Sequence, residues 1–152
     1  MNTLTIRETA EHRTAELALA QALGRVWRCD MQQMPPLAPF DYVARRAPSL
    51  LPVAVIELKI KHSRGAGDHA ATVLLDVGKY ATLRQAAYQY SCPALVVWYF
   101  ARDGLAYFID VENITPIRVE VVGRADRTEH GEAQPAFRIP LTQARRLRLG
   151  EI

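Results

Sequence analysis

Cysteine, lysine and long hydrophobic runs are all scarce in this chain of 152 residues. The two cysteines, Cys29 and Cys92, form neither a CxxC pair nor a Cys/His cluster with metal-ligand spacing, so we expect two reduced, largely buried thiols. No apolar run approaches the roughly 18 residues that span a bilayer, and no N-terminal segment has the layout of a secretory signal. These absences predict a cytoplasmic protein without a membrane partner, and they argue against a disulfide framework and a sulfur-ligated metal.

An excess of charge of one sign is also absent, because the formal net charge is only +3. That balance permits a nucleic-acid partner without demonstrating one. Only three basic residues are lysines, and Lys59, Lys61 and Lys79 all lie in the half of the chain that carries the positive excess. A lysine can exchange a proton or position a water, whereas an arginine stays charged. The cluster indicates a functional site, although an arginine-rich coding bias would also leave few lysines.

Residues 53–61 combine a strongly β-forming run with charge at its end. Side chains alternate between the faces of a strand, so Glu57 and Lys59 point to the same side. An apolar strand of this kind is normally covered on both faces, and charges in such a partly dry environment need a stabilising partner. A divalent cation and its bound water would stabilise these charges. A buried ion pair between Glu57 and Lys59 is the structural alternative.

The N-terminal segment predicts a helix over residues 6–23, with a Thr-x-x-Glu capping box at its start and Gly24 at its end. Glu16 falls on the apolar stripe of this helix, where a carboxylate is unexpected. Two interpretations are open: Glu16 serves a site, or it lies at the edge of the stripe and pairs with Arg13.

The next segments predict strands over residues 25–31 and 40–44, separated by a loop at residues 32–39 that contains three prolines. Asp41 lies inside the second of these strands. Because Asp is a poor strand former, its presence indicates either a strand edge or a ligand position.

After residues 53–61 the chain predicts a flexible polar loop at 62–69, whose two histidines lack a third ligand and are not assigned to a metal. Asp76 predicts the N-cap of a helix that runs through Tyr90 and has Lys79 near its start. Helix N-termini attract anions, so Lys79 is either a phosphate contact or a solvated side chain.

The remaining sequence predicts further strands at residues 94–100, 105–111 and 117–122, a polar mobile loop at 123–134, and a short basic helix at 141–149. That helix would carry Arg145, Arg146 and Arg148, either as a solvated face or as a phosphate contact. The order of elements predicts one α/β domain over residues 1–152, with a mixed β-sheet flanked by helices.

This order resembles the PD-(D/E)XK nuclease superfamily, which has the restriction-endonuclease-like fold, over roughly residues 5–110. The resemblance rests on Asp41, on the Glu57-Leu58-Lys59 tripeptide that ends an apolar strand, and on a helix that carries Glu16. Residues 79–84 and 93–97 are similar to small phage nucleases and archaeal Holliday-junction resolvases, but residues 32–39 replace the Gly/Ser-bearing loop typical of those resolvases.

The resemblance implies an endonuclease that depends on Mg²⁺ or Mn²⁺. Its catalytic residues would be Asp41, Glu57, Lys59 and Glu16: the first two bind the metal, Lys59 positions or activates water, and Glu16 assists. Mg²⁺ takes oxygen ligands and keeps several waters, so these two carboxylates, the backbone carbonyl of Leu58 and a substrate phosphate would be enough.

The expected partner is a nucleic acid, with DNA favoured over RNA. Lys61, Arg64 and Lys79 are the residues expected to contact it. A symmetric homodimer would suit an enzyme that cuts both strands. The tripeptide Glu-x-Lys is common by chance, and two alternatives therefore accompany the nuclease hypothesis. One is a catalytically silent nucleic-acid-binding module of the same fold, and the other is a structural protein of a phage or mobile element.

Overall fold

The computed structural model describes residues 3–123 and 133–152, with side chains from residue 10 onward. The polar loop expected at residues 123–134 falls mainly outside these ranges. The elements in chain order are α1 (Thr3–Trp27), β1 (Asp30–Gln33), β2 (Tyr42–Arg46), β3 (Leu51–Lys61), α2 (Asp68–Ala71), β4 (Thr72–Asp76), α3 (Val77–Tyr90), β5 (Ala94–Phe100), β6 (Leu105–Asp110), η1 (Val111–Asn113), β7 (Arg118–Val122), β8 (Gln134–Pro140), η3 (Leu141–Gln143) and β9 (Arg145–Arg148).

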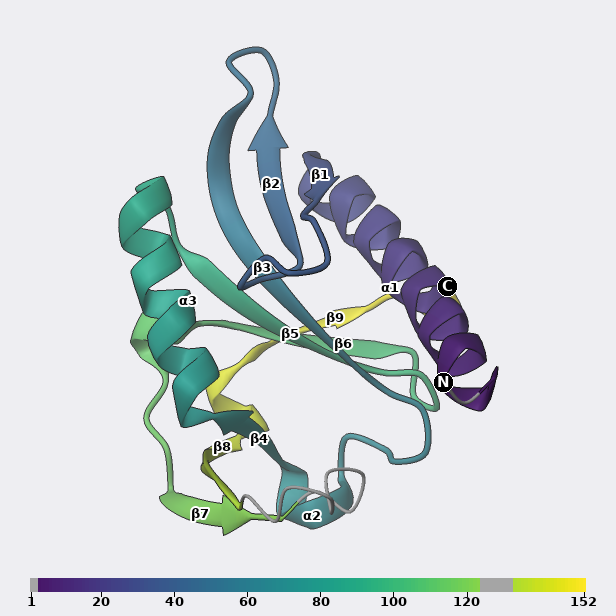
Figure 1. Ribbon diagram of the computed structural model, residues 1–152, viewed down its shortest axis with the longest axis vertical. Coiled ribbons are helices and arrows are strands. Elements are labelled where there is room, and N and C mark those ends of the chain that lie inside the picture. Colours follow the sequence, from purple (N-terminus) through teal and green to yellow (C-terminus); the bar gives the residue numbers. More distant parts are fainter. Residues whose placement is uncertain (1–2, 124–132) are drawn as a thin grey trace.

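The central feature is a six-stranded sheet in the order β1-β2-β3-β5-β6-β9 (Figure 1). Strands β3 and β5 are parallel, and the connection between them contains α3; the other neighbouring pairs are antiparallel. Helix α1 covers one face of the sheet and α3 the other. The predicted architecture, a mixed sheet flanked by helices, is confirmed. Strands β4, β8 and β7 form a second, three-stranded sheet.

Strand β3 is buried on both faces, as its apolar sequence predicts. Val55 packs with Leu83 of α3 in one core cluster. Ile56 packs with Leu19 and Leu23 of α1 in the other. Alternation along the strand therefore directs Glu57 and Lys59 towards the α3 side of the sheet. No helix among the described residues is long and apolar enough to cross a membrane.

The end of α1 corrects the predicted helix at residues 6–23 and the predicted strand at 25–31. The helix begins at Thr3, so the expected capping box lies inside it, and it continues past Gly24 to Trp27. Arg28 takes the left-handed conformation, with φ of 54°, and the Cys29 N–H donates to the Gly24 carbonyl at 3.0 Å. This bond is typical of a Schellman helix end. Glycine usually takes the left-handed position in that motif, and here Arg28 takes it.

We expect Gly24→Ala to destabilise the fold although alanine favours helix. A Cβ at this position would lie 2.9 Å from the Cys29 carbonyl oxygen and 3.1 Å from Met31 Cγ. Overpacking of this kind costs about 1–3 kcal/mol, which exceeds the gain of at most about 1 kcal/mol in helix propensity. Urea denaturation measures the change, with Gln21→Ala as the exposed control on the same helix; a more stable Gly24→Ala would contradict the close approach.

The C-terminal segment corrects the predicted basic helix at residues 141–149. Residues 141–143 form a single 3₁₀ turn, and Arg145–Arg148 form β9, which pairs with β6 at the edge of the sheet. Leu147 and Leu149 pack against the α1-side core cluster, while Arg148 between them is exposed. The period of two in this apolar pattern belongs to a strand. The strand expected at 117–122 exists as β7, but in the second sheet.

Candidate functional site

Asp41 is fixed at the point where the chain enters β2 beside β3. Its backbone N–H donates to the Ile56 carbonyl at 3.0 Å. Its carboxylate Oδ2 accepts a hydrogen bond from the Leu58 N–H at 2.7 Å. These two bonds show why an aspartate is tolerated here. Asp41 precedes β2, and its carboxylate accepts the hydrogen bond that the Leu58 N–H would otherwise donate to a carbonyl of a neighbouring strand.

Glu57 lies in the middle of β3 and is 8% exposed. Its Oε1 atom is 3.5 Å from the Lys79 Nζ. Its Oε2 atom is buried and has no hydrogen-bond partner in the described structure. The ion pair of Glu57 therefore forms with Lys79, not with Lys59 as the structural alternative required. A buried carboxylate oxygen without a partner is costly unless something outside the chain satisfies it.

The environment of Glu57 raises its pKa from 4.5 to about 7. Burial is the largest cause, and the negative charge of Asp41 adds to it. Lys79 and Lys59 act in the opposite direction without cancelling the effect. A buried carboxyl whose ionisation is disfavoured by burial and by a neighbouring carboxylate forms a site where added positive charge is stabilising.

Lys79 contributes more to this site than the sequence indicated. Besides the contact with Glu57, its Nζ donates to the Pro39 carbonyl at 3.0 Å. The side chain thus joins the first turn of α3 to the segment just before Asp41. It holds that segment against the helix and places a positive charge beside the carboxylates.

Leu58 and Lys59 complete the strand end. The N–H and C=O of one strand residue point to the same edge, so the Leu58 carbonyl faces the side on which its N–H meets Asp41. Lys59 shares the face of Glu57 and lowers the pKa of that carboxyl. In the part of the chain that the structure describes, the Lys59 ammonium has no hydrogen-bond partner.

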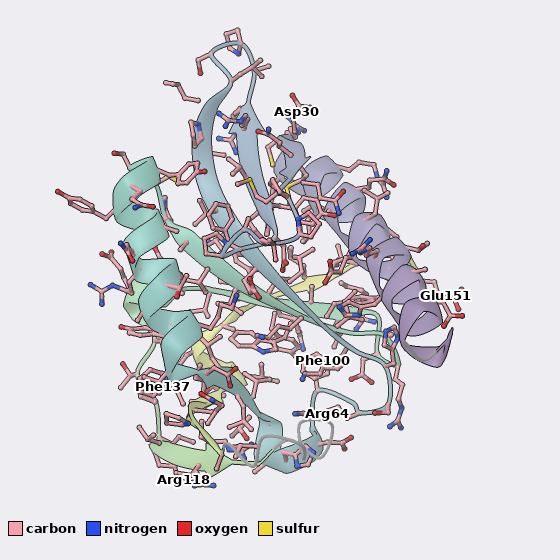
Figure 2. The ribbon with its side chains drawn as sticks, viewed as in Figure 1. Asp30, Arg64, Phe100, Arg118, Phe137 and Glu151 are labelled. Atoms are coloured by element: carbon pink, nitrogen blue, oxygen red, sulfur yellow. The ribbon has the colours of Figure 1, made fainter. Side chains whose placement is uncertain are left out.

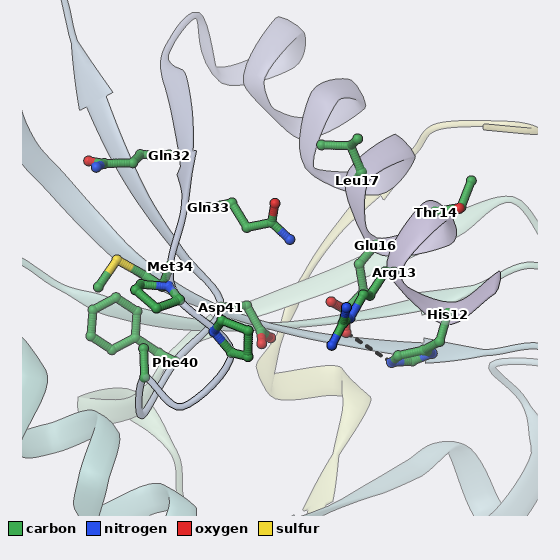
Figure 3. Close-up of a pocket in the computed structure, with 13 residues that line it drawn as sticks. His12, Arg13, Thr14, Glu16, Leu17, Gln32, Gln33, Met34, Phe40 and Asp41 are labelled. Atoms are coloured by element: carbon green, nitrogen blue, oxygen red, sulfur yellow. Dashed lines mark ion pairs between the residues drawn. The ribbon is translucent and has the colours of Figure 1, made fainter. Parts of the chain in front are cut away.

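Glu16 reaches the site from α1, on the opposite face of the sheet from Glu57. Figure 3 shows its carboxylate directed towards that of Asp41. Burial and the charge of Asp41 raise the pKa of Glu16, while His12 and Arg13 lower it. Its ion-pair partner is His12, at 2.9 Å, and not Arg13 as the alternative interpretation proposed. Glu16 and Glu57 thus both couple to Asp41, from opposite sides.

The other expected contacts lie further along the chain. Lys61 is the last residue of β3. Arg64 donates to the backbone carbonyls of Asp68 and Thr72, at 2.8 and 3.0 Å. Its guanidinium also lies 5.2 Å from the centre of the Phe100 ring (Figure 2). These contacts show that Arg64 stabilises the loop after β3 through its Nε and Nη2 groups.

A pocket of about 800 Å³ opens beside Asp41. One wall is α1 between His12 and Leu17, and the other is the segment between Gln32 and Asp41 (Figure 3). Sequence reasoning missed this pocket and treated the second segment only as a proline-containing loop. The three prolines immediately before Asp41 were the available signal, because they stiffen the segment that leads into the site.

The described residues contain no group of three or more His, Cys, Asp or Glu side chains arranged to hold a metal ion. The smaller set of Asp41, Glu57 and the Leu58 carbonyl remains compatible with a hard cation such as Mg²⁺, because that ion takes few protein ligands and completes its octahedron with water and phosphate oxygens. The unpartnered Glu57 Oε2 is the atom of this set that most needs a ligand.

No known protein family and no curated protein matches the chain. Among solved structures it is similar to Hjc, a Holliday junction resolvase from the archaeal hyperthermophile Archaeoglobus fulgidus, with 16% sequence identity and a TM-score of 0.49, over 81% of this chain and 88% of Hjc. Values this low do not define a function, so the functional conclusion rests on the residues of the site.

Proposed function

We propose that this protein is a metal-dependent nuclease that hydrolyses phosphodiester bonds, with DNA as the expected substrate. The observation that carries the proposal is the buried, unpartnered Oε2 of Glu57 beside the carboxylate of Asp41. Such a pair is unfavourable in the isolated chain and becomes favourable when a divalent cation is added.

The residues present fit Mg²⁺ or Mn²⁺. Asp41 and Glu57 would supply carboxylate oxygens and Leu58 its backbone carbonyl. The Leu58 N–H fixes the Asp41 carboxylate by a bond of 2.7 Å, which reduces the cost of ordering it. The chemistry that such an ion supplies when bound is a water of lowered pKa and an offset to the charge that grows on the phosphorus oxygens.

The chain's own groups would do the remaining work. The Lys59 ammonium orients the attacking water, because it shares the face of Glu57 and its donors are uncommitted. Lys79 keeps the segment before Asp41 in place and adds positive charge near the phosphate. Glu16, on α1, would assist through the interaction of its charge with that of Asp41. Lys61 and Arg64 remain proposed contacts to the nucleic-acid backbone, although Arg64 also donates to the Asp68 and Thr72 carbonyls.

Mn²⁺ is expected to raise the melting temperature of the wild type and not that of Asp41→Asn. At a free concentration about 100 times the Kd, binding adds roughly 2.7 kcal/mol, or roughly 5–10 °C in Tm for a domain of this size. Asn can keep the bond from the Leu58 N–H while it removes one ligand charge. Differential scanning calorimetry at pH 8, with Asp30→Asn as the exposed control, makes the comparison.

An equal Tm increase in Asp41→Asn would place the metal elsewhere. No increase in the wild type would remove the main support for catalysis and favour the structural-protein alternative. A silent nucleic-acid-binding module predicts DNA binding that does not depend on Asp41 or on a divalent ion.

A further inference from the structure

The pocket beside Asp41 contains hydrogen-bonding groups that the chain itself does not use. Arg13 lies on its α1 wall and Gln33 on the opposite wall. Within the described residues, neither the Arg13 guanidinium nor the Gln33 amide has a hydrogen-bond partner. Figure 3 shows the Gln33 side chain extending into the space between the two walls. The pocket therefore presents a charged donor and an amide to whatever enters it.

The same pocket has apolar surface in positions suited to a flat ligand. Leu17, on the α1 wall, is 44% exposed and offers apolar surface to the pocket. Pro35 and Pro36 line the opposite wall. These groups would shield the faces of a planar ring, while Arg13 and Gln33 bind its polar edge and its phosphate.

The location of the pocket restricts what the ligand can be. Asp41 belongs both to the pocket wall and to the proposed metal site. A ligand in the pocket would therefore be adjacent to the scissile phosphate. A paired base in a duplex cannot enter a space between two walls, because its edge is occupied and its faces are stacked.

We propose that the pocket between α1 and the Gln32–Asp41 segment binds one unpaired nucleotide next to the scissile phosphate. Gln33 donates to and accepts from the base edge, as a side-chain amide can. Arg13 binds the phosphate of that nucleotide. His12 contacts Glu16 at 2.9 Å and lowers the pKa of that carboxyl. The inference rests on the proposed nuclease function and specifies its substrate: a strand with an unpaired nucleotide at the cleavage position.

The test uses the full chain and three DNAs of one sequence: a blunt duplex, the same duplex with one unpaired nucleotide, and the single strand. Fluorescence anisotropy in EDTA gives binding without cleavage. We expect the wild type to bind the duplex with the unpaired nucleotide about tenfold more tightly than the blunt duplex. Arg13→Ala and Gln33→Ala are expected to reduce this ratio to about two, whereas the exposed controls Arg25→Ala and Gln85→Ala leave it unchanged.

A fluorescent base analogue, 2-aminopurine, at the unpaired position supplies a second readout. Its emission is expected to change on binding to the wild type and to change less with Gln33→Ala. Equal binding of blunt and unpaired duplexes, or a ratio that survives both substitutions, would overturn the nucleotide pocket.

The two proposals fail in different ways. Mn²⁺-dependent cleavage without any preference for the unpaired nucleotide would refute the pocket and leave the nuclease intact. A preference that depends on Gln33, with no cleavage of any substrate in Mn²⁺, would support the pocket as a nucleotide site and refute the nuclease function on which its role beside a scissile phosphate depends.

Discussion

Asp41→Asn and Lys59→Ala are each expected to lower phosphodiester hydrolysis by on the order of 10³-fold, without loss of fold. Asp41→Asn removes a ligand charge next to Glu57. Lys59→Ala removes the ammonium that orients the water, and this side chain has no hydrogen bond to lose within the described structure. The large effect follows because both groups act on charge that develops in the transition state, in a site partly shielded from water.

The measurement is cleavage of supercoiled plasmid, a four-way junction and single-stranded RNA, each in Mn²⁺, Mg²⁺ or EDTA. Asp30→Asn and Arg25→Ala are the charge-matched controls, since both residues are exposed and lie outside the proposed site. Cleavage by the wild type and both controls, abolished by EDTA, would establish the enzyme and its substrate class. Equal cleavage by wild type and Lys59→Ala would point to a contaminating nuclease or a different site.

The sequence predicted the elements whose formation is local. Residues 94–100 form β5 as expected, because a continuous apolar run is a local signal. Asp76 takes the N-cap position of α3 as expected, although its side chain makes no capping hydrogen bond there. The β3 strand was predicted, with Glu57 and Lys59 on one face, from its apolar run and the alternation of strand side chains. Strand β4 was missed, because residues 72–76 are stabilised by pairing with β8, whose paired residues lie 60 to 68 positions later in the chain.

The site divides in the same way. Glu57 and Lys59 follow from alternation along one strand. The link between Lys79 and Pro39, and the pairing of Glu16 with His12 instead of Arg13, depend on how helices approach the sheet. The pocket depends on the distance between α1 and the segment before Asp41, which no local pattern encodes. The basic C-terminal helix was wrong because its arginines were read as a helix face, although its leucines alternate as in a strand.

Without divalent metal, the wild type is expected to lose stability as the pH rises from 5 to 8. Burial and the charge of Asp41 raise the pKa of Glu57 from 4.5 to about 7, so the folded state binds this proton more tightly than the unfolded chain does. The stabilisation is complete below pH 4.5 and is lost as the pH passes through 7. The difference corresponds to about 3 kcal/mol, or roughly 6–12 °C in Tm.

Thermal melts of wild type and Glu57→Gln in EDTA measure this contribution. The neutral glutamine should remove the decline, so that Glu57→Gln melts above the wild type at pH 8 and close to it at pH 5. Glu120→Gln is the contrasting control. Its carboxylate is bound by Arg138 and Arg118, which hold its pKa at about 2, so the stability it contributes is constant between pH 5 and 8.

Two further results follow if Glu57 is the group that titrates. Lys79 lowers the pKa of Glu57 in the folded state, so in Lys79→Met the decline in Tm should start at the same pH as in the wild type but continue to a higher pH and be larger. Mn²⁺ competes with the proton, so its effect on Tm should grow as the pH rises through 7. If the Tm of the wild type and that of Glu57→Gln changed with pH in the same way across this range, ionisation of Glu57 would not be unfavourable in the folded protein. The main argument for a cation at this site would then fail.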